Sequence, residues 1–208
     1  MGRVHAIIKR SDAHADAISF AVKSSNTISL PRYRDQQRSE LIIIAYRVLA
    51  WLEQQMPAQS AGAFIHPGNV FDAYSAISKV LGSATEDVLV VDPYLDEMIL
   101  IEYGSSVPPG VLIRLLTDPN NYKKNLLPAL ARWQEQYGVQ RPIELRLSEP
   151  RRLHDRAIFV DSAAVWTLTQ SIKDFAKRAP GHISRVDSIA QEKRDAYEAL
   201  WAESKPPA

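Results

Sequence analysis

The stretch Leu153-His154-Asp155-Arg156-Ala157-Ile158-Phe159-Val160-Asp161 joins a short apolar run to two basic side chains placed two residues apart. The apolar run predicts a buried strand from about residue 156 to residue 160. On a strand, side chains two apart share a face, so His154 and Arg156 are expected to point the same way. The stretch therefore predicts an imidazole beside a fixed positive charge where a strand begins.

This pair of side chains suits a phosphate group. An imidazole can attack phosphorus or carry a proton, and a guanidinium neutralises two phosphate oxygens through its rigid fork. The carboxylate of Asp161 is a candidate for orienting the His154 ring. The stretch therefore predicts a site that either binds a phosphate ester or acts on one.

The spacing His-x-Arg-x4-Asp resembles the His-x-Lys-x4-Asp signature of the phospholipase D superfamily, which also lies on a strand and is followed by a Ser-x-Asn pair. Here the downstream position reads Gln170-Ser171-Ile172-Lys173. The resemblance implies site roles for five residues: His154, Arg156, Asp161, Ser171 and Lys173. It covers the chain from about Phe64 to about Trp201.

Two positions depart from the superfamily pattern. Arg156 stands in place of the lysine, and Lys173 stands in place of the phosphate-binding asparagine. Arginine keeps the charge but is bulkier and planar, while lysine replaces a neutral amide with a cation. These changes favour anion binding over catalysis, and the chain is in this respect similar to the non-catalytic phospholipase-D-like domain of some membrane-trafficking adaptors.

Further cations flank the motif. A short helix is expected over residues 171–178, and its positions 173 and 177 would share a face. The predicted phosphate-binding residues are Arg152, Arg156, Lys173 and Lys177. The alternative is an ordinary solvated charge pattern, diluted by Asp174. His182 follows in the next strand and is a candidate to line the same cavity as His154.

Composition bounds the partners. The 208 residues, 46% of them hydrophobic, support one globular domain plus an appendage. A net charge of +1, from 25 basic and 24 acidic residues, means that any nucleic-acid or phosphate affinity must come from a local cluster. The chain has no cysteine and no metal-type histidine spacing, so we expect a cytoplasmic protein without metal or cofactor.

A polar segment bearing Pro57 and Gly62 predicts the boundary between an N-terminal helical appendage, residues 1–60, and a phospholipase-D-like domain, residues 61–208. Two helices are expected in the appendage, at about 12–23 and 34–55. The apolar run from Leu41 to Leu52 falls short of the roughly 20 residues that cross a bilayer. Its helical stripe predicts core or dimer packing, or contact with a protein partner.

Beyond the boundary, predicted helices and strands alternate. Helices are expected near residues 70–81, 96–103, 124–137 and 188–203, and strands at 88–91, 111–116, 143–147 and 164–168. This order predicts an α/β fold with a mixed sheet flanked by helices, one phospholipase-D-like unit. Asp92 and Asp118 each follow a strand and precede proline, which favours turn formation over a catalytic role.

Superfamily members place two motif copies face to face, in one chain or across a homodimer, whereas this sequence has one copy. Three functions remain open. The first is a degenerate domain that binds a phosphate-containing ligand or a protein partner without catalysis. The second is a metal-independent phosphodiesterase or nuclease, active as a homodimer through a phosphohistidine. The third is a regulatory protein of bacterial defence or of a mobile element.

Overall fold

The computed structural model describes residues 20–24, 39–45, 48, 62–161 and 163–207. The chain divides into two compact units, Met1–Ser60 and Ala61–Ala208. In the first unit the described residues are helical, and the rest of the two predicted helices lies outside them. Four of its side chains form a buried cluster of their own: Phe20, Leu41, Ile44 and Val48. Three residues of the predicted stripe therefore pack inside their own unit.

The second unit is built on a seven-stranded sheet, in the order β1-β7-β6-β5-β2-β3-β4. The strands are β1 (Gly62–Ile65), β2 (Asp87–Val91), β3 (Leu112–Thr117), β4 (Ile143–Leu147), β5 (Ala157–Val160), β6 (Ala164–Leu168) and β7 (Gly181–Val186). The strands β2, β3 and β4 run parallel, and every other pairing is antiparallel. The predicted α/β fold with a mixed sheet is confirmed.

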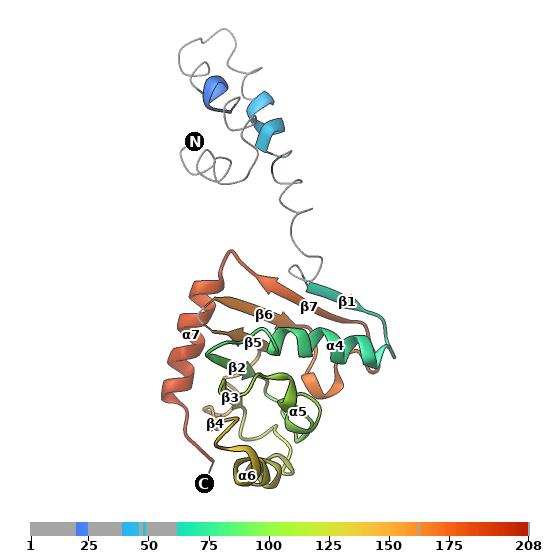
Figure 1. Ribbon diagram of the computed structural model, residues 1–208, viewed down its shortest axis with the longest axis vertical. Helices are drawn as coiled ribbons and strands as arrows, with labels where there is room; N and C mark the ends of the chain where they lie inside the picture. The colour runs from blue at the N-terminus through green and yellow to red at the C-terminus, as the bar shows by residue number, and fades with distance from the viewer. Residues whose placement is uncertain (1–19, 25–38, 46–47, 49–61, 162, 208) are drawn as a thin grey trace. The chain divides into compact units, whose positions relative to one another are not determined.

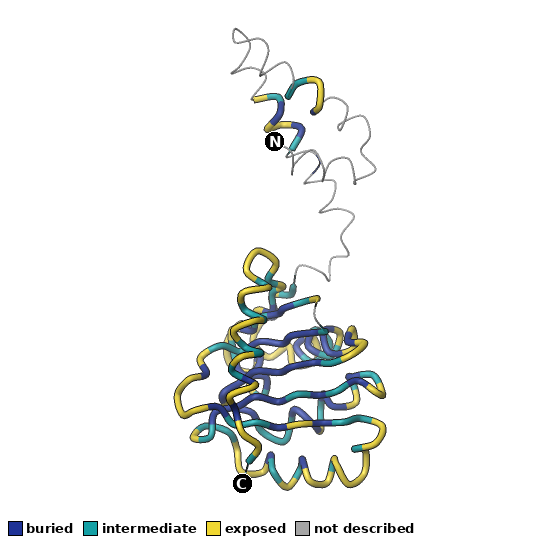
Figure 2. The backbone as a smooth tube through the Cα atoms, turned by 90° about the vertical axis from the view of Figure 1, so that its left-hand side faces the viewer, coloured by how far each residue is buried: buried dark blue, intermediate teal, exposed yellow. Residues whose placement is uncertain are grey.

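Helices cover both faces of this sheet (Figure 1). On one face lie α4 (Val70–Leu81), α5 (Met98–Ile101) and α6 (Leu126–Tyr137), and on the other lies α7 (Ala190–Glu203). The central strand β2 contributes side chains to the hydrophobic cores on both faces of the sheet. Val88 and Val90 belong to the larger core, while Leu89 and Val91 pack with residues of α7. Figure 2 shows the buried residues concentrated along the strands in the middle of this unit. A strand buried on both sides reads as a continuous apolar run, as this one does.

The predicted helix over residues 171–178 is wrong. The segment contains one 3-10 turn, η3 (Ile172–Asp174), after which Phe175 is extended and Ala176 adopts a left-handed φ of 56°. Both of these side chains are buried, and the Ala176 carbonyl accepts a 2.8 Å hydrogen bond from the Gly68 amide. Tertiary packing thus overrides local helix propensity here, and Lys173 and Lys177 do not share a helix face.

Strand β1 was not predicted, because a four-residue segment that begins with glycine gives a weak strand signal. Gly62 has a φ of 120°, and a Cβ atom there would lie 2.2 Å from the carbonyl oxygen of Ile183. Only glycine fits both the backbone angle and the close approach to β7. The strand therefore depends on Gly62 for its start and on β7 for its pairing.

The ion pairs of Arg114 hold α7 on the sheet. Its guanidinium donates two bonds to Glu198 of α7, at 2.6 and 2.7 Å, and its Nε donates to Asp87 at 2.7 Å. The side chain of Arg114 is 13% exposed, and it lies over the Trp201 ring. These contacts hold the pKa of Glu198 below its usual value, because the Arg114 hydrogen bond favours the charged carboxylate.

We expect Arg114→Ala to lower the free energy of unfolding by about 2 kcal/mol, since it leaves a partly buried carboxylate unpaired. The measurement is urea unfolding followed by tryptophan fluorescence. Arg132→Ala is the matched control, because Arg132 forms an exposed pair with Glu135 and should change stability by less than about 0.5 kcal/mol. Equal effects of the two substitutions would contradict this account of α7.

Candidate anion site at the edge of the sheet

Several strands end close together on the side of the sheet where β2 has its carboxyl end. Val91, at the end of β2, pairs with Ala157 at the start of β5, and Ala157 pairs with Thr167 near the end of β6. Strand β5 runs against β2, so the direction of the strands changes at this point. Crevices outside the carboxyl ends of strands, at such a change, are the usual ligand sites of open α/β sheets.

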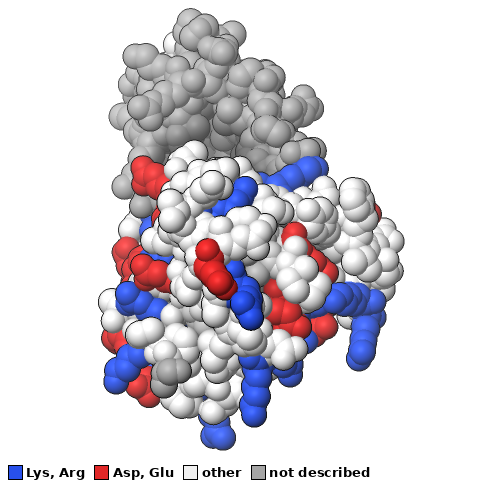
Figure 3. All heavy atoms as spheres, turned by 60° about the horizontal axis from the view of Figure 1, so that its bottom comes forward, with Lys and Arg blue, Asp and Glu red and all other residues white. Residues whose placement is uncertain are grey.

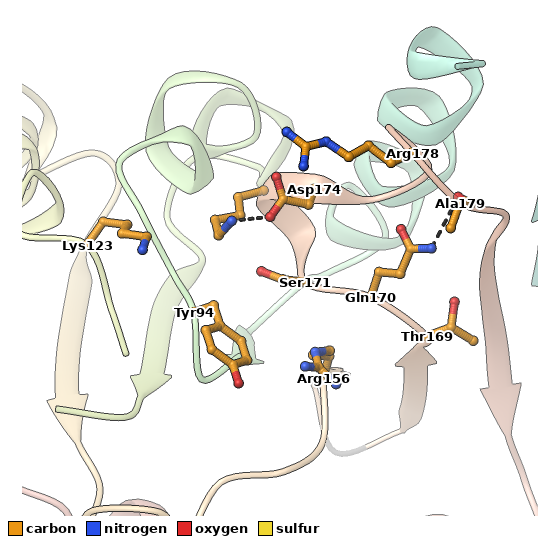
Figure 4. Close-up of a pocket in the computed structure, with 10 residues that line it drawn as sticks. Tyr94, Lys123, Arg156, Thr169, Gln170, Ser171, Asp174, Arg178 and Ala179 are labelled. Atoms are coloured by element: carbon orange, nitrogen blue, oxygen red, sulfur yellow. Dashed lines mark hydrogen bonds and ion pairs between the residues drawn. The ribbon is translucent and has the colours of Figure 1, made fainter. Parts of the chain in front are cut away.

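A cavity of about 670 Å³ opens at this edge (Figure 4). Its lining residues are Tyr94, Lys123, Arg156, Thr169, Gln170, Ser171, Lys173, Asp174, Arg178 and Ala179. Four of these side chains are cationic and one is a carboxylate. The cations come from three separate segments of the chain, so the fold gathers positive charge here that no single stretch of sequence shows.

Arg156 lies in the wall of this cavity. Its guanidinium carbon is 5.4 Å from the centre of the Tyr94 ring, in a cation–π contact. Its Nε is buried and has no hydrogen-bond partner among the described residues. A buried donor without an acceptor costs free energy. The guanidinium also forms no salt bridge within the described residues, so its charge is left for a ligand in the cavity.

Ser171 is held by a buried carboxylate that the sequence had not placed in the site. Asp92 is fully buried, and its Oδ2 accepts hydrogen bonds of 2.8 Å from the Ser171 hydroxyl and the Ile172 amide. Its Oδ1 accepts from the Tyr94 amide at 2.9 Å. Burial raises the pKa of Asp92, while these donors and the charge of Arg156 act in the opposite direction.

The loop that carries Ser171 is closed by its neighbour Gln170. The Gln170 amide donates to the carbonyls of Ala179 and Pro180, at 3.1 and 2.9 Å, and its oxygen accepts from the Ala176 amide at 3.0 Å. One side chain thus ties both ends of an irregular segment together. This bracing fixes the backbone around Ser171 without a regular helix.

The predicted cations are only partly brought together. Lys173 lines the cavity with Arg156 and forms an ion pair with Asp174, which lowers the pKa of that carboxyl group. Lys177 is exposed and does not line the cavity. Arg152 is also absent from its wall and pairs with Glu203 at 2.5 Å. Arg178, which the sequence places in the same group of cations as Lys173 and Lys177, does line it, and so does Lys123, which was not predicted.

His154 and His182 are both exposed, and neither lines the cavity. The flanking residue Leu153 packs with the α7 layer, and Asp155 forms an ion pair with Lys193 of α7. This pair holds the pKa of Asp155 low, as expected for a carboxylate bonded to a lysine. His154 and Arg156 precede β5, so the strand begins later than the motif.

Asp161 does not orient the His154 ring. It follows β5 at the end opposite to His154, in a left-handed conformation with φ of 49°. Its carboxylate accepts from the backbone amides of Thr85, Glu86 and Asp87, at 2.8 to 3.1 Å, and from the Thr85 hydroxyl at 2.9 Å. Asp161 therefore fixes the loop before β2 and takes no part in the cavity.

The turn interpretation of Asp92 and Asp118 is confirmed, although it is incomplete. Asp118 accepts from the Asn120 amide at 2.8 Å, and Asp92 accepts from Tyr94 in the same pattern. Both carboxylates are also fully buried and reach a second loop, because Asp118 accepts from the Arg151 amide at 2.6 Å. For Asp92 the sequence signal was an aspartate directly after the apolar residues of β2, whereas β3 contains Arg114 and Thr117 before Asp118.

Charges elsewhere are mixed. On the face that Figure 3 presents, basic and acidic side chains are interspersed, as the near-zero net charge implies.

Within the described residues, no group of three histidine or acidic side chains could hold a metal ion. The same residues contain no helix that is long and apolar enough to cross a bilayer. The cavity is therefore a local concentration of positive charge on a mixed surface.

No family model matches this chain, and no curated protein matches its sequence. Solved structures do match its fold. NucT from Helicobacter pylori has a TM-score of 0.52 at 12% identity, with 70% of this chain and 98% of NucT covered. Nuc from Salmonella typhimurium, a phospholipase D family member, has a TM-score of 0.50 at 14% identity, with 71% and 97% covered. The α/β unit thus has a phospholipase-D-like fold, which confirms the resemblance at that level.

Replacing Asp161 with asparagine should lower the free energy of unfolding by about 1 kcal/mol at neutral pH, because the charged acceptor of several amide bonds is lost. Asparagine tolerates the left-handed backbone, so the variant isolates the charge. Burial alone would raise the pKa of Asp161, but the amides of Glu86, Thr85 and Asp87 lower it overall. Its stabilisation is therefore present above the unfolded pKa, about 3.9, and is lost as pH falls through the lower folded value.

Urea unfolding at several pH values measures this effect, and the difference between wild type and variant should narrow below about pH 4. Asp187→Asn is the control, since Asp187 pairs with Arg185 and is 71% exposed. A difference that stays constant with pH would refute the charged-acceptor role of Asp161.

Proposed function

We propose that the second unit is a phospholipase-D-like domain that binds a phosphate-containing ligand without catalysing its cleavage. The observation that carries the proposal is the Arg156 guanidinium, which forms no salt bridge within the described residues and lies in the wall of a cavity lined by three further cations. A phosphate group would meet the part of the guanidinium that lines the cavity. A guanidinium that meets phosphate through its fork also gains charge-assisted bonds, which are stronger than neutral ones.

The other cations of the cavity support this proposal. Lys173 is largely neutralised by Asp174. Lys123 and Arg178, however, have no ion-pair partner in the part of the chain that the structure describes. Together with Arg156 they leave the cavity with excess positive charge, which attracts a multiply charged anion. Contacts to phosphate do not distinguish one base sequence from another, so the proposal defines the ligand only by its phosphate group.

Catalysis by a single copy is disfavoured by the place of His154. A nucleophile must lie within about 3–3.5 Å of phosphorus, and misplacement by about 1 Å can cost a hundredfold in rate. His154 is exposed and outside the cavity wall, while the Asp161 carboxylate is bonded to the loop before β2.

One observation favours the alternative of a homodimeric phosphodiesterase: an exposed His154 on this side of the sheet is accessible to a second copy of the chain.

The binding test compares the affinity of inorganic phosphate for the full chain and for Arg156→Ala, measured by calorimetry at low salt. We expect the substitution to weaken binding about 10- to 100-fold, as the loss of charge-assisted bonds implies. Arg152→Ala is the matched control, because it removes an arginine near the motif that pairs with Glu203 and does not line the cavity. If the wild-type protein binds no phosphate, or if both variants bind equally, the proposed site is wrong.

The activity test incubates the protein with single- and double-stranded nucleic acids and with a chromogenic phosphodiester in EDTA, while its mass in solution is determined. We expect no turnover, and unchanged phosphate affinity in His154→Ala, because His154 lies outside the cavity. Turnover by a dimer that disappears in His154→Ala would replace the binding function with the histidine-dependent phosphodiesterase.

A further inference from the structure

The Ser171 hydroxyl is committed as a donor before any ligand arrives. A serine hydroxyl has one proton and two lone pairs. Its bond to Oδ2 of Asp92, at 2.8 Å, is its only hydrogen bond within the described residues. An ionised carboxylate can only accept, so with Asp92 charged the proton between these two oxygens belongs to Ser171.

Burial raises the pKa of Asp92 overall, while its hydrogen bonds and a nearby cation oppose that effect and favour the charged form. The backbone amides of Tyr94 and Ile172 both donate to it, and Arg156 lies near enough to contribute a favourable charge. Although burial acts the other way, hydrogen bonds to the charged form and an adjacent cation are the two influences that keep a carboxylate ionised. Because both amides already donate to Asp92, they cannot donate to a ligand.

The consequence is an acceptor inside a cationic cavity. Ser171 lines the cavity, and in Figure 4 its hydroxyl oxygen points from its loop toward the side of Tyr94. With the proton turned to Asp92, only lone pairs are left for a ligand. A fully ionised oxygen placed there would face another acceptor, which is repulsive, whereas a ligand hydroxyl would form a bond.

We infer that the cavity selects an anion that carries its own proton, such as monohydrogen phosphate, over sulfate or a phosphodiester. The inference rests on the proposed anion-binding function and specifies its ligand. The P–OH group donates to Ser171 Oγ while the ionised oxygens meet Arg156 and Lys123. Sulfate and phosphodiesters have no such proton at neutral pH, so one contact becomes repulsive, and specificity arises from that unfavourable pairing.

Calorimetry with the full chain tests this inference, using inorganic phosphate against sulfate at neutral pH. A second pair, methyl phosphate against dimethyl phosphate, is compared at about pH 5, below the second pKa of a phosphomonoester, which is about 6. We expect each protonated anion to bind at least about tenfold more tightly than its partner, the ratio that one hydrogen bond to a charged group provides. The first pair is decisive because sulfate is a dianion at neutral pH. Charge alone would make it bind as well as phosphate.

Two variants separate selectivity from charge. Ser171→Ala removes the acceptor, so the ratio of phosphate to sulfate affinity should fall toward one. Lys123→Ala removes a cation from the same cavity and should weaken both anions while leaving the ratio unchanged. The wild-type ratio is informative by itself, so the inference stays testable if Ser171→Ala fails to fold, as circular dichroism would reveal.

The outcomes are distinct. Binding of neither anion overturns the proposed function. Sulfate that binds as tightly as phosphate leaves that function standing and overturns the inference, as does phosphate selectivity that persists in a folded Ser171→Ala protein. Selectivity in the wild type that is lost in Ser171→Ala and kept in Lys123→Ala is the expected result.

Discussion

The cavity depends on one buried carboxylate, that of Asp92. It stands where β2 leaves the sheet, and it receives three hydrogen bonds, two of them from the loop that follows β6. A charge taken out of water must be compensated by such donors or it destabilises the fold. If the loop moved away, the carboxylate would remain buried with two acceptor sites empty, so the position of Ser171 is coupled to the integrity of the central strand.

Around the contact between Asp92 and the loop that carries Ser171, the fold brings together cationic side chains from distant parts of the sequence. Lys123 comes from the segment after β3, Arg156 precedes β5, and Arg178 follows η3. On the face that Figure 3 presents, acidic residues are interspersed among the basic ones. The sheet edge brings the cations together, and the chain as a whole stays nearly neutral.

Local patterns predicted what depends on local physics. The strands 143–147 and 164–168 and the helix 70–81 match their sequence expectations, because their apolar residues repeat with the period of the element. Arg156, Ser171 and Lys173, which the motif groups together, line one cavity. The failures concern tertiary constraints: burial of Phe175 and Ala176 prevents a helix. The acceptor role of Asp161, and the membership of Asp92 in the site, depend on partners more than 70 residues away.

The place of β1 has a consequence for the order of folding. It is the first strand of the sheet in the sequence, yet its partner is β7, with Gly62 opposite Ser184 (Figure 1). During synthesis the ribosome releases β1 long before β7 exists, so the strand that follows residues 1–60 must wait for almost the entire sheet to be translated. Closure of this edge is therefore a late, long-range event, and until then a nascent chain exposes an unpaired strand to other chains.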